Sequence, residues 1–270
     1  MNDHMNHIDL IKQLDFKPDH ERMEIIAGWL TQYGVPYRVQ KYPTGTNLVA
    51  DLGITEKRIG ISSHFDRIPE SPGANDNGSA IAVCLAIIKT FLEKNSDGIG
   101  LRVFFFDEEE TGLKGSAAYT QQYGVGDLIG LINMELVGIG DKFAIWPVDQ
   151  RSSGRLLETF ERCAKARDIA ARRFDKIVTN TADHLSFRKA GLADAFTITC
   201  ISDQDIEAAG RYYIAMEQGA GTGTLMKILS QAPIFLNYHQ PGDSYDKIDE
   251  KAVSMTARVL WDTVTSISSI

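Results

Sequence analysis

The chain has 270 residues, and its 28 lysines and arginines against 36 aspartates and glutamates give a formal net charge of −8. Apolar residues make up 43% of the sequence and charged residues 24%, which excludes a disordered chain, a collagen-like chain and a disulfide framework. The acidic balance argues against a broad nucleic-acid-binding surface, because such a surface must neutralise phosphate charge.

Hydrophobic periodicity and turn residues predict helices that alternate with strands. The predicted helices cover residues 19–33, 79–94, 115–123, 153–167, 183–190, 203–219 and 250–267. The predicted strands cover residues 36–41, 47–52, 58–63, 101–106, 129–137 and 195–201. The first two strands are expected to form a hairpin at a sheet edge, since Pro36 has no backbone N–H to donate. Asp19 and Asp249 are expected to cap the first and last helices.

Several predicted strands, such as 101–106, are apolar throughout, which is typical of strands buried on both faces. The sequence therefore predicts a single α/β domain over residues 1–270. In it, a mixed, mostly parallel central sheet lies between helices on both faces, as a three-layer sandwich. Residues 203–232 are expected to form a helical insertion, either a pocket wall or lid, or a decoration of the surface.

Cysteine and apolar patterns bear on the compartment. The three scattered cysteines form no disulfide or metal-binding motif. The longest apolar run, residues 80–88, is far shorter than the ~18 residues of a membrane span, and residues 1–12 lack the apolar stretch of a secretory signal. We therefore expect a cytoplasmic protein without membrane or nucleic-acid partners, while the oligomeric state stays open.

Histidine and acidic side chains follow the ends of the predicted core strands. They are His64, Asp66, Asp76, the run 107–110, Glu135 and His239. Singly, each has an ordinary explanation: Asp76 can cap a helix, and four acids can form a solvated loop. Ligands in open α/β sheets bind at the carboxyl ends of strands, and crowded carboxylates there need a compensating cation. This set of nitrogen and oxygen donors suits zinc, manganese or cobalt.

Six stretches between residues 64 and 243 carry a family resemblance. They are His64-x-Asp66, Gly73-Ala74-x-Asp76-Asn77-Gly78-Ser79, Glu109-Glu110-x-Gly112-Leu113-x-Gly115-Ser116, Asn133-Met134-Glu135-x-x-Gly138, Asp183-His184-x-x-Phe187 and Tyr238-His239-x-x-x-Asp243. Together, and in this order, they resemble the zinc aminopeptidases of metallopeptidase family twenty-eight. That family also includes glutaminyl cyclases, glutamate carboxypeptidase and the non-enzymatic transferrin receptor.

The resemblance implies two divalent metal ions, most simply zinc. Asp76 would bridge them, with His64 and Glu135 on one ion and Glu110 and His239 on the other. The family usually has aspartate where this chain has Glu135, so the geometry and metal preference of that subsite are open. A cis peptide bond is expected after Asp76.

The resemblance also implies roles around the metals. Glu109 would be the general base on the attacking water, and Asp66 would orient His64 from behind. Asp243 is expected to act similarly near His239. Tyr238 would donate to the developing oxyanion, although a buried tyrosine at a strand end explains it nearly as well.

Two further residues, Asp183 and His184, open a short predicted helix. Asp183 is explained as a cap, and His184 is left out of the ligand set because the resemblance places this pair near the metals without binding them.

The expected function is removal of N-terminal residues from peptide substrates. A glutaminyl cyclase acting on one zinc is the first alternative; those enzymes resemble Gly-Ala-x-Asp-Ser-Ala and carry Trp before the last His, whereas this chain has Asp76-Asn77-Gly78 and Tyr238. A non-catalytic binding module is disfavoured by the complete ligand set with Glu109. A carboxypeptidase would need a basic pocket that the sequence does not locate.

Overall fold

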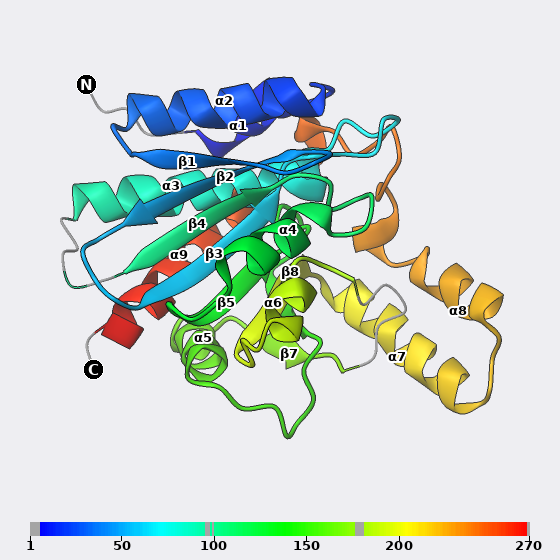
Figure 1. Cartoon of the computed structure of the whole chain (residues 1–270). Coiled ribbons are helices and arrows are strands. Elements are labelled where there is room, and N and C mark those ends of the chain that lie inside the picture. Colours follow the sequence, from blue (N-terminus) through cyan, green and yellow to red (C-terminus); the bar gives the residue numbers. More distant parts are fainter. Residues whose placement is uncertain (1–5, 95–97, 99, 176–180, 269–270) are drawn as a thin grey trace.

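The computed structural model describes residues 6–94, 98, 100–175 and 181–268, and within them eight strands form one sheet (Figure 1). The strands are β1 Tyr37–Lys41, β2 Thr46–Leu52, β3 Arg58–His64, β4 Leu101–Phe106, β5 Leu128–Met134, β6 Lys142–Trp146, β7 Ala171–Arg173 and β8 Ala195–Ile201. Their spatial order is β1-β2-β4-β3-β5-β8-β6-β7.

The four central strands β4, β3, β5 and β8 are parallel, which confirms the predicted mixed, mostly parallel sheet. At one edge β1 and β2 form the predicted antiparallel hairpin. At the other edge β6 runs antiparallel to β8 and carries the three-residue β7. The parallel arrangement brings the carboxyl ends of β3, β4 and β5 to one edge of the sheet.

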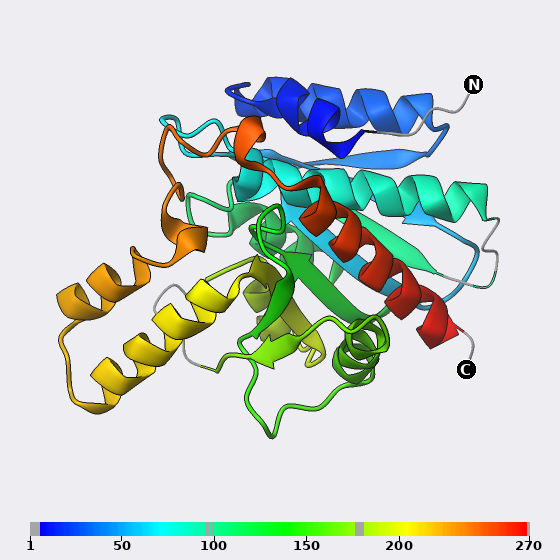
Figure 2. The ribbon, with the colours of Figure 1, turned by 180° about the vertical axis from the view of Figure 1, so that it is seen from behind.

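Helices cover both faces of the sheet (Figures 1 and 2). They are α1 His7–Leu14, α2 Asp19–Gln32, α3 Ser79–Glu93, α4 Lys114–Tyr123, α5 Arg155–Ala166, α6 His184–Lys189, α7 Asp203–Glu217, α8 Thr222–Leu229 and α9 Glu250–Ser268. The larger core lies under α1, α2, α3, α5 and α9, and a second core lies under α4 and α6. Helices α7 and α8 project from the body as a hairpin.

Four local features differ from the sequence prediction. Helix α1 and strands β6 and β7 were not predicted. Helix α1 begins in a polar segment and β7 has only three residues, whereas β6 has five residues, as many as the predicted β1, and was missed. Helix α2 has Pro18 at its N-cap, so Asp19 is its first residue rather than its cap. Asp249 does cap α9, since its carboxylate accepts a hydrogen bond from the backbone N–H of Lys251 (2.9 Å).

The second core is built from aromatic rings. The ring of Phe104 on β4 lies 4.8 Å from that of Tyr119 and 5.4 Å from that of Phe187, both edge-on, and 5.2 Å from that of Phe106. All four side chains are fully buried. Edge-on pairs add to the free energy gained by burial, so this cluster holds α4 and α6 against the strand that leads into the site.

Phe104→Ala is expected to lower the free energy of unfolding by about 3–5 kcal/mol, because it removes a buried ring and leaves a cavity. The measurement is urea unfolding of the whole chain. Phe16→Ala is the matched control: Phe16 is 59% exposed, and surface substitutions usually stay within about 0.5 kcal/mol. Equal losses in the two variants would contradict the packing argument.

Candidate metal centre

Five of the predicted ligands meet at the carboxyl edge of the sheet. His64 is the last residue of β3, Glu110 lies in the loop after β4, and Glu135 directly follows β5. Asp76 lies in the turn Ala74–Gly78 that leads into α3, and His239 lies in the loop before α9. Because β4 and β5 flank β3 in the sheet, these loops are neighbours in space.

The two oxygens of Asp76 face two different imidazoles. Nε2 of His64 lies 3.2 Å from Oδ1 of Asp76 and 3.2 Å from Oε2 of Glu135. Nε2 of His239 lies 3.2 Å from Oδ2 of Asp76 and 3.1 Å from Oε2 of Glu110. The structure thus forms two three-residue groups that share Asp76, and each is compact enough to hold a metal ion.

These spacings fit zinc. Ligand atoms about 2.0 Å from a tetrahedral ion are separated from one another by about 3.3 Å. The buried Nε2 of His239 makes no aligned hydrogen bond, although two carboxylate oxygens lie within 3.2 Å, and the buried Oε1 of Glu110 also lacks a hydrogen-bond partner. An imidazole nitrogen and two carboxylate oxygens that lie this close without aligned hydrogen bonds are the arrangement that a bound cation would satisfy.

The electrostatics of the cluster point the same way. Burial raises the pKa of Glu109, Glu110 and Glu135, and neighbouring carboxylates add to the rise. Burial works against the protonated form of His239, yet Asp76 and Glu110 raise its pKa to about 9. The same competition raises the pKa of His64. Burial and mutual repulsion thus oppose the ionised form of three neighbouring carboxyl groups, and a bound divalent cation would relieve that opposition.

Asp66 connects two parts of the site. Its carboxylate accepts hydrogen bonds from the backbone N–H groups of Glu109 (3.0 Å) and Glu110 (3.1 Å). Its Oδ1 also lies 3.3 Å from Nδ1 of His64. One buried side chain therefore orients a histidine and fixes the backbone that carries both glutamates.

Asp243 differs from its expected place beside His239. Its carboxylate accepts hydrogen bonds from the backbone N–H groups of Asn75 (2.7 Å) and Asp76 (3.1 Å). It therefore holds the turn that presents Asp76, because a buried carboxylate pairs with the nearest free backbone donors. The peptide bond after Asp76 is cis, which confirms that prediction.

Two asparagines hold the carboxylate of Glu135, and sequence reasoning gave them no role. Nδ2 of Asn133 donates to one oxygen of Glu135 (2.9 Å) and Nδ2 of Asn77 donates to the other (2.7 Å). Both asparagines are fully buried. Both lie inside the stretches that carried the resemblance, so proximity to a ligand in the sequence was the available signal.

Arg22 was also missed, and no sequence pattern marks it. It is fully buried on α2, and its guanidinium donates to the carbonyl oxygens of Pro72 (3.3 Å) and Gly73 (3.2 Å). Gly73 has a φ of +76°, and a Cβ there would lie 2.5 Å from Nη1 of Arg22. Burial lowers the pKa of Arg22 to about 10. This arginine supports the turn of Asp76 from below.

Three further residues from the predicted stretches lie outside the two groups of ligands. Glu108 lies outside the site, where it accepts hydrogen bonds from Thr44 and from Lys114 (3.0 Å). Asp183 precedes α6 but makes no capping hydrogen bond; it is fully buried, which raises its pKa to about 7. His184 belongs to neither group of ligands; its Nδ1 lies 2.6 Å from Oγ1 of Thr197, which accepts a hydrogen bond from Asn133.

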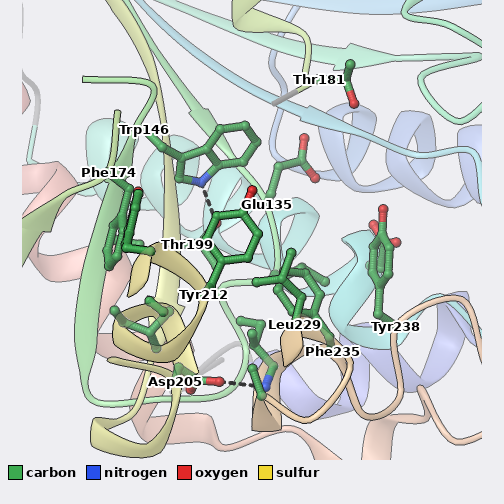
Figure 3. A pocket seen from close by; sticks show the side chains of 18 of the residues that line it. Glu135, Trp146, Phe174, Thr181, Thr199, Asp205, Tyr212, Leu229, Phe235 and Tyr238 are labelled. Atoms are coloured by element: carbon green, nitrogen blue, oxygen red, sulfur yellow. Dashed lines mark hydrogen bonds between the residues drawn. The ribbon is translucent and has the colours of Figure 1, made fainter. Parts of the chain in front are cut away.

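A cavity opens beside the ligands (Figure 3). His64, Asp76, Glu109 and Glu135 line one end of it. Tyr238 lines it too, and its ring stacks on that of His239 with centroids 3.7 Å apart. Burial and the nearby carboxylates raise the pKa of Tyr238, so its hydroxyl stays protonated and can donate a hydrogen bond into the cavity. Glu109 and Tyr238 thus face the same space.

Among the described residues, no helix is long and apolar enough to cross a membrane.

The probable lipoprotein aminopeptidase LpqL of Mycobacterium tuberculosis is 27% identical over 251 residues, which cover 82% of this chain and 48% of that protein. The chain thus spans about half of that relative, and smaller fractions of other curated relatives such as the vacuolar membrane protease of Candida glabrata.

Two solved structures resemble the whole chain. A Zn-dependent exopeptidase from Parabacteroides distasonis has a TM-score of 0.73 at 16% identity and covers 96% of both chains. Porphyromonas gingivalis glutaminyl cyclase has a TM-score of 0.74 at 17% identity and covers 97% of both chains. These likenesses show the shared fold. The model of Peptidase family M28 matches residues 47–264, and the chain therefore belongs to this peptidase family.

Proposed function

We propose that the chain is a metal-dependent aminopeptidase that uses two divalent ions, most simply zinc, to remove N-terminal residues from peptides. The observation that carries the proposal is the shared position of Asp76, whose two oxygens face the two histidine-containing groups at 3.2 Å. Membership of a peptidase family and an aminopeptidase among the relatives support it.

His64, Asp76 and Glu135 would hold one ion, and Asp76, Glu110 and His239 the other. Two divalent ions carry a charge of +4 against −3 from these three carboxylates. When bound, such ions lower the pKa of a water and polarise a carbonyl group.

The chain's own groups would manage the proton and the developing charge. Glu109 faces the cavity beside both metal groups, so it can take the proton from the attacking water and return it to the leaving amine. Tyr238 can donate to the carbonyl oxygen as that oxygen becomes negative. Asp66 holds the backbone of Glu109 in place, because its carboxylate accepts a hydrogen bond from the backbone N–H of Glu109.

The described lining of the cavity offers no basic partner for a substrate carboxylate. Among the described residues that line it, none is lysine or arginine. A carboxypeptidase would need such a partner, which disfavours that function.

The second candidate is a glutaminyl cyclase, because a cyclase has the same fold. Metal analysis by mass spectrometry beside a panel of aminoacyl-nitroanilides separates the two functions. Two metals with cleavage support the aminopeptidase. One metal with cyclisation of N-terminal glutamine would replace it, and metal without either reaction would favour a binding module.

Glu109→Gln is expected to lower turnover by about 10²–10⁴-fold while both metals stay bound, since the amide keeps the shape but cannot take a proton. Glu108→Gln is the matched control, because Glu108 lies outside the site, and it should keep its activity. Turnover and metal content are measured side by side. Full activity of Glu109→Gln would overturn the role of the base.

Glu110→Gln and Glu135→Ala should each lower metal content together with activity, because a carboxylate donor is lost. The readout is metal per chain after dialysis, with Glu108→Gln again as the control. Full metal content in Glu135→Ala would mean that Glu135 is only a neighbour of the ligands.

Arg22→Met should make the metals easier to remove, since two buried carbonyl groups beneath the turn of Asp76 lose their donor. The measurement is the chelator concentration that strips half of the metal. Arg172→Met changes an exposed arginine on β7 and serves as the control. Equal resistance to chelator in the two variants would remove Arg22 from the support of the metal centre.

A further inference from the structure

The cavity continues past the metal-binding side chains into an apolar chamber. Most of its lining beyond the site is made of rings and aliphatic groups, among them Trp146, Phe174, Ala209, Tyr212, Leu229 and Phe235. Figure 3 shows the rings of Trp146, Phe174, Tyr212 and Phe235 around the same space as Glu135. A chamber of this composition favours an apolar group on the part of the substrate next to the reacting bond.

Two polar side chains in the chamber wall are already paired. Nε1 of Trp146 donates to Oγ1 of Thr199 (3.0 Å). The carboxylate of Asp205 accepts hydrogen bonds from the backbone N–H groups of Ser202 (2.7 Å) and Ile234 (2.9 Å), and from the hydroxyl of Ser202 (2.6 Å). With these acceptors occupied, the chamber gives a charged side chain little to pair with, and burying an unpaired charge is costly.

Much of this wall belongs to the projecting hairpin rather than to the sheet. Helix α7 contributes Ala209 and Tyr212, helix α8 contributes Leu229, and the turn Pro233–Phe235 contributes Phe235. Inside the hairpin, Tyr212 and Leu229 pack together in a small core of their own. The two helices therefore form one body, which projects from the sheet (Figure 1) and supplies part of the chamber wall (Figure 3).

Asp205 fixes this body to the rest of the molecule. Ser202 directly follows the last residue of β8. Ile234 lies in the turn Pro233–Phe235, which follows α8. The single buried carboxylate of Asp205 binds both positions. It sits in the first turn of α7 within a capping box with Ser202, so one side chain holds the start of the helix and joins it to the returning chain at Ile234.

We propose that the α7–α8 hairpin is the specificity-determining wall for the substrate's N-terminal side chain, that it selects a large uncharged residue such as phenylalanine or leucine, and that Asp205 is its positioning residue. The inference rests on the proposed aminopeptidase function. It assigns the size limit of the chamber to Ala209 and Tyr212, which line the chamber from α7.

The first test fills the chamber. Ala209→Leu adds three carbon atoms to the wall and should lower kcat/KM for phenylalanyl- and leucyl-nitroanilide by roughly 10-fold or more, while the alanyl substrate keeps its rate. Glu207→Leu, two residues away on the exposed face of α7, is the matched control and should change none of the three. An equal loss of kcat/KM on all three substrates, or no loss, would overturn the proposal that the hairpin limits the size of the substrate side chain.

The second test loosens the wall. In Asp205→Asn the amide has one acceptor oxygen for two backbone partners, so either the exit from β8 or the return at Ile234 loses its hydrogen bond. The expected result is a raised KM for the phenylalanyl substrate with kcat and metal content retained. Asp203→Asn, at an exposed position of the same helix, is the control. An unchanged KM in Asp205→Asn would remove its positioning role.

A binding measurement separates this proposal from the proposed function. Calorimetry should show free L-phenylalanine binding to the metal-loaded wild type at least roughly 10-fold more tightly than L-lysine, and Ala209→Leu should abolish the difference. Selective binding without hydrolysis of any nitroanilide would support the specificity proposal and contradict the proposed aminopeptidase function. Hydrolysis that prefers lysyl substrates would keep the aminopeptidase and reject the wall.

Discussion

The shared carboxylate of Asp76 is the constraint around which the site is built. One side chain has to face two histidines that come from distant parts of the chain, and its two oxygens leave little freedom for the backbone beneath them. Asp243 holds that backbone through two N–H groups, and Arg22 holds the carbonyl groups just before it. A carboxylate thus holds the N–H groups of the turn, and a guanidinium holds the carbonyl groups that lead into it.

The sheet explains why so much negative charge can gather in one place. The three neighbouring parallel strands β3, β4 and β5 end at the same edge of the sheet. Each has a histidine or an acidic residue at its last position or in the loop directly after it. Burial makes these carboxylates costly to ionise, and hydrogen bonds from asparagine amides and backbone N–H groups offset part of that cost. The fold thus supplies a rigid negative cluster whose remaining charge suits divalent cations.

The sequence was enough to predict the fold class, because apolar strands and amphipathic helices leave a periodic pattern. The candidate ligands His64, Glu110 and Glu135 lie at or just after strand ends and leave a local signal, whereas the family resemblance was needed to add Asp76 and His239. The expected contact of Asp243 was wrong, since the side chain's nearest donors lie in a loop far away in the sequence. Arg22 could not be found, because a buried arginine on an amphipathic helix looks like a solvated one until its partners are known. The edge strand β7 has three residues and too little pattern to detect.

The hairpin of α7 and α8 leaves the body and returns to it at two points held by one aspartate. Such an attachment separates two tasks in the chain: the sheet edge carries the reactive groups, and a looped-out segment shapes the space beside them. The strand order and the cluster around Asp76 lie outside the segment between Ser202 and Ile234. Under the proposed function, exchange of this one short stretch is expected to change which substrates are accepted while the metal-binding side chains stay where they are.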